Sequence, residues 1–593
     1  MSLFGSLYTG VSGLRTSQNS LNTTAHNLAN VGTNGYVRQQ VVQTDSSYIK
    51  WGVTRHSTLQ YGLGVDISTV RQVRDRFLDS SYRKELGRQG FYDAQYETVS
   101  EMESMFGELE GVTFQSSIDG FWSSIQELAK EPDSIVARAA VIQTSISFLE
   151  HAENISKQLK DYQVNLNTQI KNNVDRVNQI ASEIDVLNKQ ISFYESGGVE
   201  KANDLRDYRN NLLDELGKIM SITYKENSNN VVTVMAEGVP LVTEDYANKM
   251  GTVKVNSTSD MIKPVWPFLD NGDVFNLDKA PSTERDTDVG SLKGLILSRG
   301  DEISNYTDIP IREENESDES FNNRVAKFNN TVGASVIMSM QAQFDQLIHG
   351  VVTKINDLLS PNKEVEVATD QVITLSDGST LTLKAGESLT VLDTDNAPVG
   401  MDEDNTMGEA LFNRKSVARY GEEITVMIKD KDGNDVPTKV RIYNKENPDD
   451  NYSLFTLGEI EVNPEIMNNY SKIPLNSNNG TDGFDIKTAE ALANAWKEPF
   501  AALSPNTLTV STFKDYYTAL IGDLATRGEQ LNNMGENQEA MANNINNQRQ
   551  QVMGVSSDEE LTNLIKYQHA YNASSRYITV VDSMLEHLIS RLG

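Results

Sequence analysis

Apolar residues recur with helical spacing at both extreme ends of this 593-residue chain. Leucine returns every seven residues near the N-terminus, and over the last thirty or so residues apolar side chains step by three and four. The principal stripe positions are Leu7, Leu14, Leu21, Leu28, Leu564, Tyr571, Ile578, Leu585 and Leu592. Such a stripe lays one face of a helix against other helices. We therefore expect both ends to be helical assembly interfaces, although chain termini usually fray.

The N-terminal stripe predicts a helix over residues 3–29 that stops at Asn30 and Gly32. Gly5, Gly10 and Gly13 lie in its first half, and each costs about 1 kcal/mol relative to alanine in a helix interior. The predicted helix should thus be poorly formed alone. We expect packing on neighbouring copies of the chain to order it.

Interior stretches show stronger helical patterns. One apolar stripe runs from Ile155 to Ile191, and a second begins at Leu205, so residues 135–218 predict a long antiparallel helix pair. Residues 329–359 and 512–545 repeat the same spacing. We expect the helices of 135–218 and 512–545 to form a core within one chain, although an asparagine- and glutamine-rich stretch through Gln550 weakens the apolar face of the second.

In residues 221–286 and 361–452 the apolar residues change to the period of two that is typical of strands. Within 361–452, Asp377-Gly378 and Asp432-Gly433 each separate two strand-like runs, which predicts hairpins. The predicted fold class is α+β, multidomain and elongated, with a coiled-coil domain of terminal helices, a helical-bundle domain and two β-rich inserted domains. The predicted domains are 1–50 with 555–593 (terminal assembly), 51–220 with 287–360 and 453–554 (helical core), 221–286 (β-rich) and 361–452 (β-rich variable insertion).

Composition narrows the possible functions. The formal net charge is −32, yet the first 50 residues carry +2 and residues 561–593 carry +1, so the acidic excess lies between the ends. This balance argues against nucleic-acid and anionic-membrane partners. The absence of cysteine excludes disulfides and thiolate chemistry. No apolar run reaches the length of about 20 residues that a membrane span needs, and the N-terminus lacks the pattern of a cleaved signal.

We find no pattern for catalysis, a cofactor or a metal. The six histidines are scattered, and phosphate-binding loops and nucleophile elbows are absent from the sequence. Asp430–Asp435 resembles a calcium loop only superficially, because its glycine is fourth and Arg441 stands where the twelfth-position glutamate belongs. A hairpin turn is the better prediction there.

The sharpest local motif is Asn27, Ala29, Asn30, Thr33, Gly35 and Tyr36, which follows the first helix. Physically it is a helix end, a turn of residues that tolerate positive φ, and an aromatic anchor; an ordinary helix-exit loop has the same physics. The motif resembles the shared N-terminal motif of bacterial flagellar rod, hook and hook-associated proteins, and the helix of 561–592 resembles their C-terminal motif. Arg74–Leu78, Leu454–Pro464 and the helices of 135–218 favour the hook-associated members.

The resemblance implies a structural, non-enzymatic protein that forms the hook–filament junction as a ring of copies, with no cofactor. It implies secretion, uncleaved, through the flagellar type III apparatus, with a cytoplasmic export chaperone on the C-terminal helix. The implied partners are other copies of the chain, the flagellar hook protein and a second hook–filament junction protein, with no nucleic acid and no membrane. The alternatives are another axial protein (hook or distal rod), or an exported protein whose 361–452 insertion is an adhesin or hydrolase.

Overall fold

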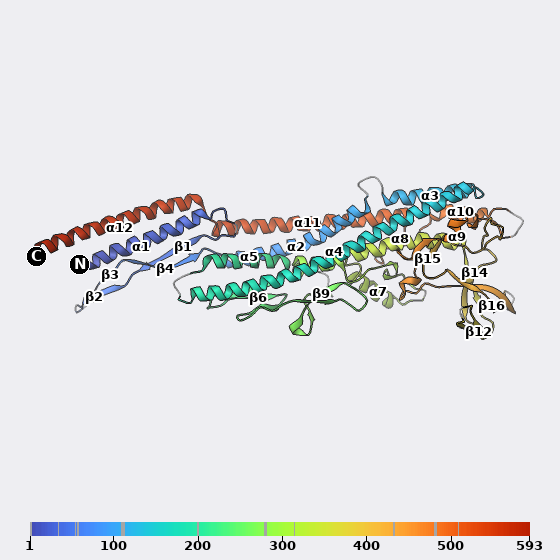
Figure 1. Ribbon diagram of the computed structural model, residues 1–593, viewed down its shortest axis with the longest axis horizontal. Helices are drawn as coiled ribbons and strands as arrows, with labels where there is room; N and C mark the ends of the chain where they lie inside the picture. Colours follow the sequence, from blue (N-terminus) through green and yellow to red (C-terminus); the bar gives the residue numbers. More distant parts are fainter. Residues whose placement is uncertain are drawn as a thin grey trace.

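Long helices run lengthwise through an elongated molecule that has both chain ends at one extremity and a β-rich lobe at the other (Figure 1). The computed structural model describes residues 3–33, 35–53, 55, 58–107, 113–197, 201–277, 281–313, 315–376, 378–430, 433–478, 483–507 and 509–592. The helices are α1 (Leu3–Ala29), α2 (Arg76–Phe106), α3 (Phe114–Lys130), α4 (Ile135–Glu195), α5 (Asn203–Ile219), α6 (Ser291–Arg299), α7 (Asp318–Asn330), α8 (Val336–Leu359), α9 (Pro464–Asn468), α10 (Ile486–Ala495), α11 (Phe513–Met553) and α12 (Ser557–Leu592).

The strands are short and pair antiparallel. They are β1 (Gln39–Asp45), β2 (Tyr48–Val53), β3 (Thr58–Gly62), β4 (Val65–Gln72), β5 (Ile222–Glu226), β6 (Val232–Ala236), β7 (Val239–Val242), β8 (Gly251–Lys254), β9 (Ile262–Trp266), β10 (Gly272–Asp273), β11 (Asn362–Glu366), β12 (Gln371–Thr374), β13 (Thr380–Leu383), β14 (Ser388–Leu392), β15 (Phe412–Arg414), β16 (Tyr420–Lys429), β17 (Asp435–Tyr443) and β18 (Ile460–Val462). The molecule is thus a mixed helix-and-strand protein of several parts.

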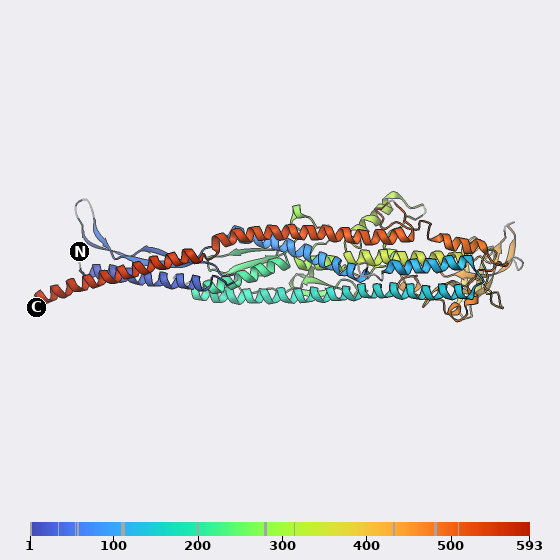
Figure 2. The ribbon, with the colours of Figure 1, turned by 90° about the horizontal axis from the view of Figure 1, so that it is seen from above.

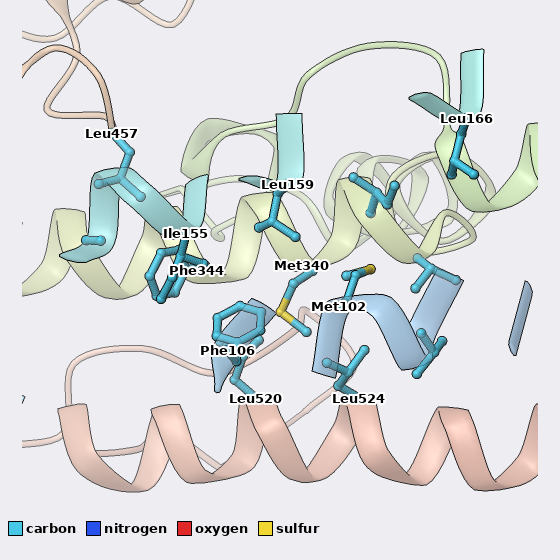
Figure 3. Packing of buried hydrophobic residues seen from close by; sticks show 14 of the residues in the cluster. Met102, Phe106, Ile155, Leu159, Leu166, Met340, Phe344, Leu457, Leu520 and Leu524 are labelled. Atoms are coloured by element: carbon cyan, nitrogen blue, oxygen red, sulfur yellow. The ribbon is translucent and has the colours of Figure 1, made fainter. Parts of the chain in front are cut away.

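The core of the rod lies between α2, α4, α8 and α11. Figure 3 shows Phe106, Phe344 and Leu520 meeting from three of these helices, and the rings of Phe106 and Phe344 are 5.4 Å apart in an edge-to-face arrangement. The predicted stripe of α4 is buried from Ile155 to Ile191, apart from partly buried Tyr162. These helices therefore form the internal core that their periodicity predicts.

Two small sheets lie beside α4, with the strand orders β5-β6-β7 and β10-β9-β8. At the far end, β11-β14-β17-β16 form a four-stranded sheet and β12-β13 a hairpin. Both predicted hairpins are confirmed, because β12 pairs with β13 and β16 with β17. The turn residues Asp377 and Asp432 lie outside the described residues. In the second turn, the backbone N–H of Asn434 donates to Asp430 Oδ1 at 2.8 Å, so the Asp430 carboxylate helps to close the turn.

Strands β1 to β4 form a ribbon beside α1. Strand β1 pairs with β4, and β2 pairs with β3 beyond it, so the chain runs out along α1 and returns (Figure 1). A two-stranded ribbon is marginally stable by itself. Its inner edge is tied to α1 where Ser12 Oγ accepts the backbone N–H of Val65 at 3.2 Å.

Two classes of site are missing from the described part of the chain. None of its helices combines the length and the apolar character that crossing a bilayer requires. The described residues also contain no group of three or more histidine, aspartate or glutamate side chains placed to hold a metal ion.

Candidate functional site

The two terminal helices pair with each other. Helices α1 and α12 lie side by side and antiparallel, and α12 continues the line of α11 beyond the end of the rod (Figures 1 and 2). The sequence predicts helices at both ends, and the structure brings both into one projecting unit. We call α1, α12 and the β1–β4 ribbon the terminal unit.

Glycines make the contact between α1 and α12 close. A Cβ atom added at Gly10 would lie 2.7 Å from Ile578 Cγ1, and one added at Gly13 would lie 2.8 Å from Ser574 Oγ. No side chain larger than hydrogen fits at either position without movement of α12. The glycines that weaken the isolated helix therefore serve its packing.

The face that α1 buries is polar and composed of small residues. Its members are Thr16, Ser17, Ser20, Thr24 and Asn27, all at most 7% exposed. By contrast, Leu7, Leu14, Leu21 and Leu28 are only half-buried. On α12, Leu564, Tyr571, Ile578 and Leu585 are likewise half-buried, and the side chain of Leu592 lies outside the described residues. The predicted stripes thus border the helix pair without being enclosed by it.

Further apolar side chains on both helices point into solvent. We call Phe4, Tyr8, Val11, Val580, Met584 and Leu588 the outer apolar residues; they are between 45% and 66% exposed. Val580 and Met584 each precede a more deeply buried apolar residue of α12, Val581 and Leu585 respectively, so they are rotated from the stripe by about 100° around the helix. Sequence analysis placed Leu588 in the C-terminal stripe but missed Val580 and Met584, although their four-residue spacing was visible beside it.

A buried polar cluster fastens the two chain ends together. Asn27 Nδ2 donates to Glu560 Oε2 at 3.1 Å, and the hydroxyl of Tyr36 donates to Asn27 Oδ1 at 2.8 Å. Arg38 Nε donates to Glu560 Oε1 at 2.8 Å. We call Asn27, Tyr36, Arg38 and Glu560 the clasp. Because Glu560 is only 2% exposed, these donors replace the hydrogen bonds that water would otherwise supply.

The clasp corrects one detail of the sequence interpretation. The spacing of Ser557 and Glu560 predicts a capping box at the start of α12. In the structure, Ser556 occupies the cap position, where its Oγ accepts the backbone N–H of Glu559 at 3.5 Å. The Glu560 carboxylate instead accepts from Arg38 and Asn27, because a charged guanidinium and a buried amide outcompete a local backbone N–H.

The remaining motif residues shape the turn after α1. Thr33 Oγ1 donates to Asn30 Oδ1 at 3.1 Å, and Asn30 Nδ2 donates back to the His26 carbonyl at 2.9 Å. Gly35 has φ +76°, and a Cβ there would lie 2.2 Å from Asn211 Oδ1 on α5. Only glycine therefore fits at that position. Ala29 is exposed and makes no such contribution.

The turn also attaches the terminal unit to the rod. The buried backbone N–H of Val37 donates to Asp207 Oδ2 at 3.2 Å, and Gln72 Nε2 donates to Asp207 Oδ1 at 2.7 Å. Burial raises the pKa of Asp207 to about 7, against the opposing effect of these donors and of Arg74. Nearby, Arg549 bridges Asp79 at 2.9 Å and Asp214 at 3.0 Å. Hydrogen bonds thus attach the turn and β4 to α5, and ion pairs link α11 to α2 and α5.

Comparisons with known proteins match this arrangement. The model of the flagellar hook-associated protein FlgK helical domain matches residues 99–362, that of the flagellar basal body rod FlgEFG protein C-terminal region matches 547–591, and that of the flagella basal body rod protein matches 7–36. The last two fall on the paired terminal helices and the first on the rod. Sequence analysis expected this distribution of family resemblance.

Two relatives that align with nearly the whole chain share one name. Flagellar hook-associated protein 1 of Bacillus subtilis (strain 168) is 26% identical over 601 residues, covering 100% of this chain and 99% of the relative. The protein of that name from Escherichia coli (strain K12) is 23% identical and covers 98% of each chain. The flagellar hook junction protein FlgK of Burkholderia pseudomallei, a solved structure, is 14% identical with a TM-score of 0.44, over 80% of this chain and 100% of that one. Over its full length the chain is similar to flagellar hook-associated protein 1, a structural protein of the flagellum.

Proposed function

We propose that the chain forms the junction between the flagellar hook and filament, as a ring of copies held together through their terminal units. The observation that carries this proposal is the exposure of the outer apolar residues on a helix pair in which α1 buries a polar face. A stable monomer rarely exposes such side chains in rows unless another surface covers them. Neighbouring terminal helices, packed in coiled-coil fashion, would supply that cover.

The predicted stripe residues have a related role in this proposal. Leu7, Leu14, Leu564 and Ile578 are half-buried within one chain, so part of each side chain is available to a second helix pair. Burying an exposed leucine completely is worth up to about 1.5–3 kcal/mol. Several such side chains per subunit would favour an ordered lattice over free monomers.

The same surface requires protection before assembly. We propose that a cytoplasmic export chaperone covers α12 until secretion, since this helix carries half of the outer apolar residues. After export, the partners would be the hook protein on one side and a second junction protein on the other. The chain would then act as an extracellular component of the flagellum.

The four-part domain division stays a prediction, and the packing of residues 361–452 supports it. This stretch has a hydrophobic cluster of its own, built from Val367, Leu383, Leu389, Val391, Ile424, Val426, Ile428 and Val440. The cluster is separate from the core of the rod. An insertion with its own core can vary without disturbing the helices that carry it.

Immunogold labelling tests the proposed location. In cells that make an epitope-tagged chain in place of the untagged one, we expect label confined to the hook–filament boundary. Cells that lack the chain should shed filament subunits into the medium. Label distributed along the filament, or at the rod, would refute the junction assignment.

A further inference from the structure

A basic cleft lies where the terminal unit meets the rod. Its volume is about 630 Å³, and its walls come from β4, the start of α2, α5 and the β5–β6 pair. The cationic side chains that line it are Arg71, Arg74, Arg76, Lys201, Arg206, Arg209 and Lys225. The carboxylates in the same lining are Asp79 and Glu226 alone. Such a concentration of cations is unexpected in a chain of net charge −32.

The acidic groups of the cleft are shared among several cations. The Glu226 carboxylate forms ion pairs with Arg76 at 2.9 Å, Arg206 at 2.7 Å and Arg209 at 2.9 Å. Behind the wall, Glu195 pairs with both Arg206 and Lys201. The carboxylates therefore balance only part of the positive charge that converges here.

Asp79 neutralises little of the positive charge in the cleft. It pairs with Arg74 at 2.9 Å, but it also pairs at 2.9 Å with Arg549, which does not line the cleft. Deep in the wall, Arg209 is 2% exposed and its Nε–H has no hydrogen-bond partner among the described residues. Burial lowers the pKa of Arg209 to about 10, which is consistent with incomplete neutralisation.

Three cations at the mouth of the cleft are accessible to an incoming anion. Arg76 shares Glu226 with two other arginines and is 77% exposed at its side chain, and Arg71 donates to the neutral amide of Gln40 at 3.2 Å. Lys225 makes no ion pair within 4 Å in the part of the chain that the structure describes. An incoming anion would meet these groups first, without displacing the buried pairs.

We propose that the basic cleft binds oxyanions and that, in the assembled flagellum, the oxyanion is a carboxylate side chain of an adjacent subunit. Guanidinium groups bind carboxylate and phosphate oxygens through paired, charge-assisted hydrogen bonds, and a concave cationic surface attracts them from a distance. A second copy offers abundant ligands, with 84 acidic residues against 52 lysines and arginines. The assignment of the oxyanion to an adjacent subunit rests on the proposed assembly function, whereas oxyanion binding by the cleft does not.

Isothermal titration calorimetry on the soluble full-length chain tests the binding site directly. The probes are inorganic phosphate and a hexaglutamate peptide at low ionic strength, and the variant combines Arg71→Gln, Arg76→Gln and Lys225→Gln. The control combines Lys157→Gln, Lys171→Gln and Lys487→Gln, which removes the same charge from exposed positions elsewhere. Wild type and control should bind, and the cleft variant should bind about tenfold or more weakly. Failure of wild type to bind either probe, or unchanged binding by the cleft variant, would overturn the proposal.

Assembly in cells identifies the source of the anion. If a neighbour's carboxylate fills the cleft, the cleft variant should be incorporated poorly at the junction while the control is incorporated normally. Normal incorporation by a variant that no longer binds phosphate would show that the cleft takes a free anion, which overturns the assignment to a neighbour. Because the calorimetry uses soluble chain, its result stands apart from that of the immunogold test of the junction itself.

Discussion

Asn27 and Glu560, which are 533 positions apart in the sequence, are joined by a hydrogen bond of 3.1 Å between two buried side chains. The bond makes the first motif of the chain and the first turn of its last helix a single structural feature. Asn27 also accepts from Tyr36 and from the backbone N–H of Gln39 at 3.0 Å. One asparagine thus ties together α1, the turn, the ribbon and α12.

Replacing Asn27 with alanine should loosen the terminal helix pair. The change removes a donor from a buried carboxylate and one of two partners of the Tyr36 hydroxyl, the other being His26 Nδ1 at 2.9 Å. Leaving a buried acceptor without its donor typically costs about 1–3 kcal/mol. Amide hydrogen exchange in α12 of the soluble chain should accelerate accordingly, with little change in α4. Asn22→Ala, at an exposed position of the same helix, is the matched control. Equal exchange in the two variants would argue against the clasp.

Gly10→Ala should also destabilise the pair, although alanine normally stabilises a helix by about 0.5–1 kcal/mol relative to glycine. The new Cβ would lie 2.7 Å from Ile578 Cγ1, and an isoleucine side chain has little freedom to rotate away. Gly522→Ala in α11, where a Cβ meets nothing within 4 Å, should have the opposite effect. Gly10→Ala should lower the protease resistance of α12, and Gly522→Ala should raise the unfolding midpoint. A gain in both would be inconsistent with close packing at Gly10.

The stability contributed by Glu446 should depend on pH. Burial opposes its ionisation, but His349, the backbone N–H of Phe455 and the hydroxyl of Tyr306 outweigh that effect and lower its pKa to about 2. A folded-state pKa below the unfolded value stabilises the protein at higher pH, and that contribution is lost as pH falls from about 4.5 towards 2.

Denaturant unfolding of Glu446→Gln across this range provides the measurement. The variant should be less stable than wild type at pH 6, and the difference should shrink steadily below pH 4.5. Glu403→Gln, which changes an exposed carboxylate of the same lobe, should show no such trend. A difference that is independent of pH would contradict the assignment.

Substitution in the core should reduce stability, whereas substitution of an outer apolar residue should impair assembly. Phe344→Ala removes a ring that packs on Phe106 and Phe114 in the rod, and such truncations cost about 3–5 kcal/mol. Val580→Asp changes an exposed side chain and should alter monomer stability by no more than about 0.5 kcal/mol. Only the second variant should fold normally yet fail to enter the junction. Thermal unfolding and fractionation of flagella distinguish the two effects.

Much of the rod follows from the sequence, because the apolar period and the buried face coincide in α4 and, as far as Leu531, in α11. Beyond Leu531 the apolar residue Met541 is exposed. The helices at both ends also follow from their period, and so do the two hairpins of the β-rich lobe. The family motif at Asn27–Tyr36 was identified as a helix end and a turn. In these cases a local pattern and the final environment agree.

The terminal unit shows where local patterns stop being informative. The buried face of α1 consists of serine, threonine and asparagine, which no apolar pattern can reveal. Glu560 fits a capping box locally, yet its partners come from residues more than five hundred positions away. The basic cleft is assembled from four separate elements, so no single window of sequence contains it.

Cysteine labelling at Val580 tests most directly whether the terminal helices are surfaces for neighbouring copies. The chain has no native cysteine, so Val580→Cys provides a unique thiol, and Lys157→Cys on the rod provides a comparison. Both thiols should react with a maleimide in the soluble chain. In isolated hook–filament junctions, we expect Val580→Cys to be protected and Lys157→Cys to remain reactive. Equal reactivity of Val580→Cys in the free and assembled states would contradict the central claim.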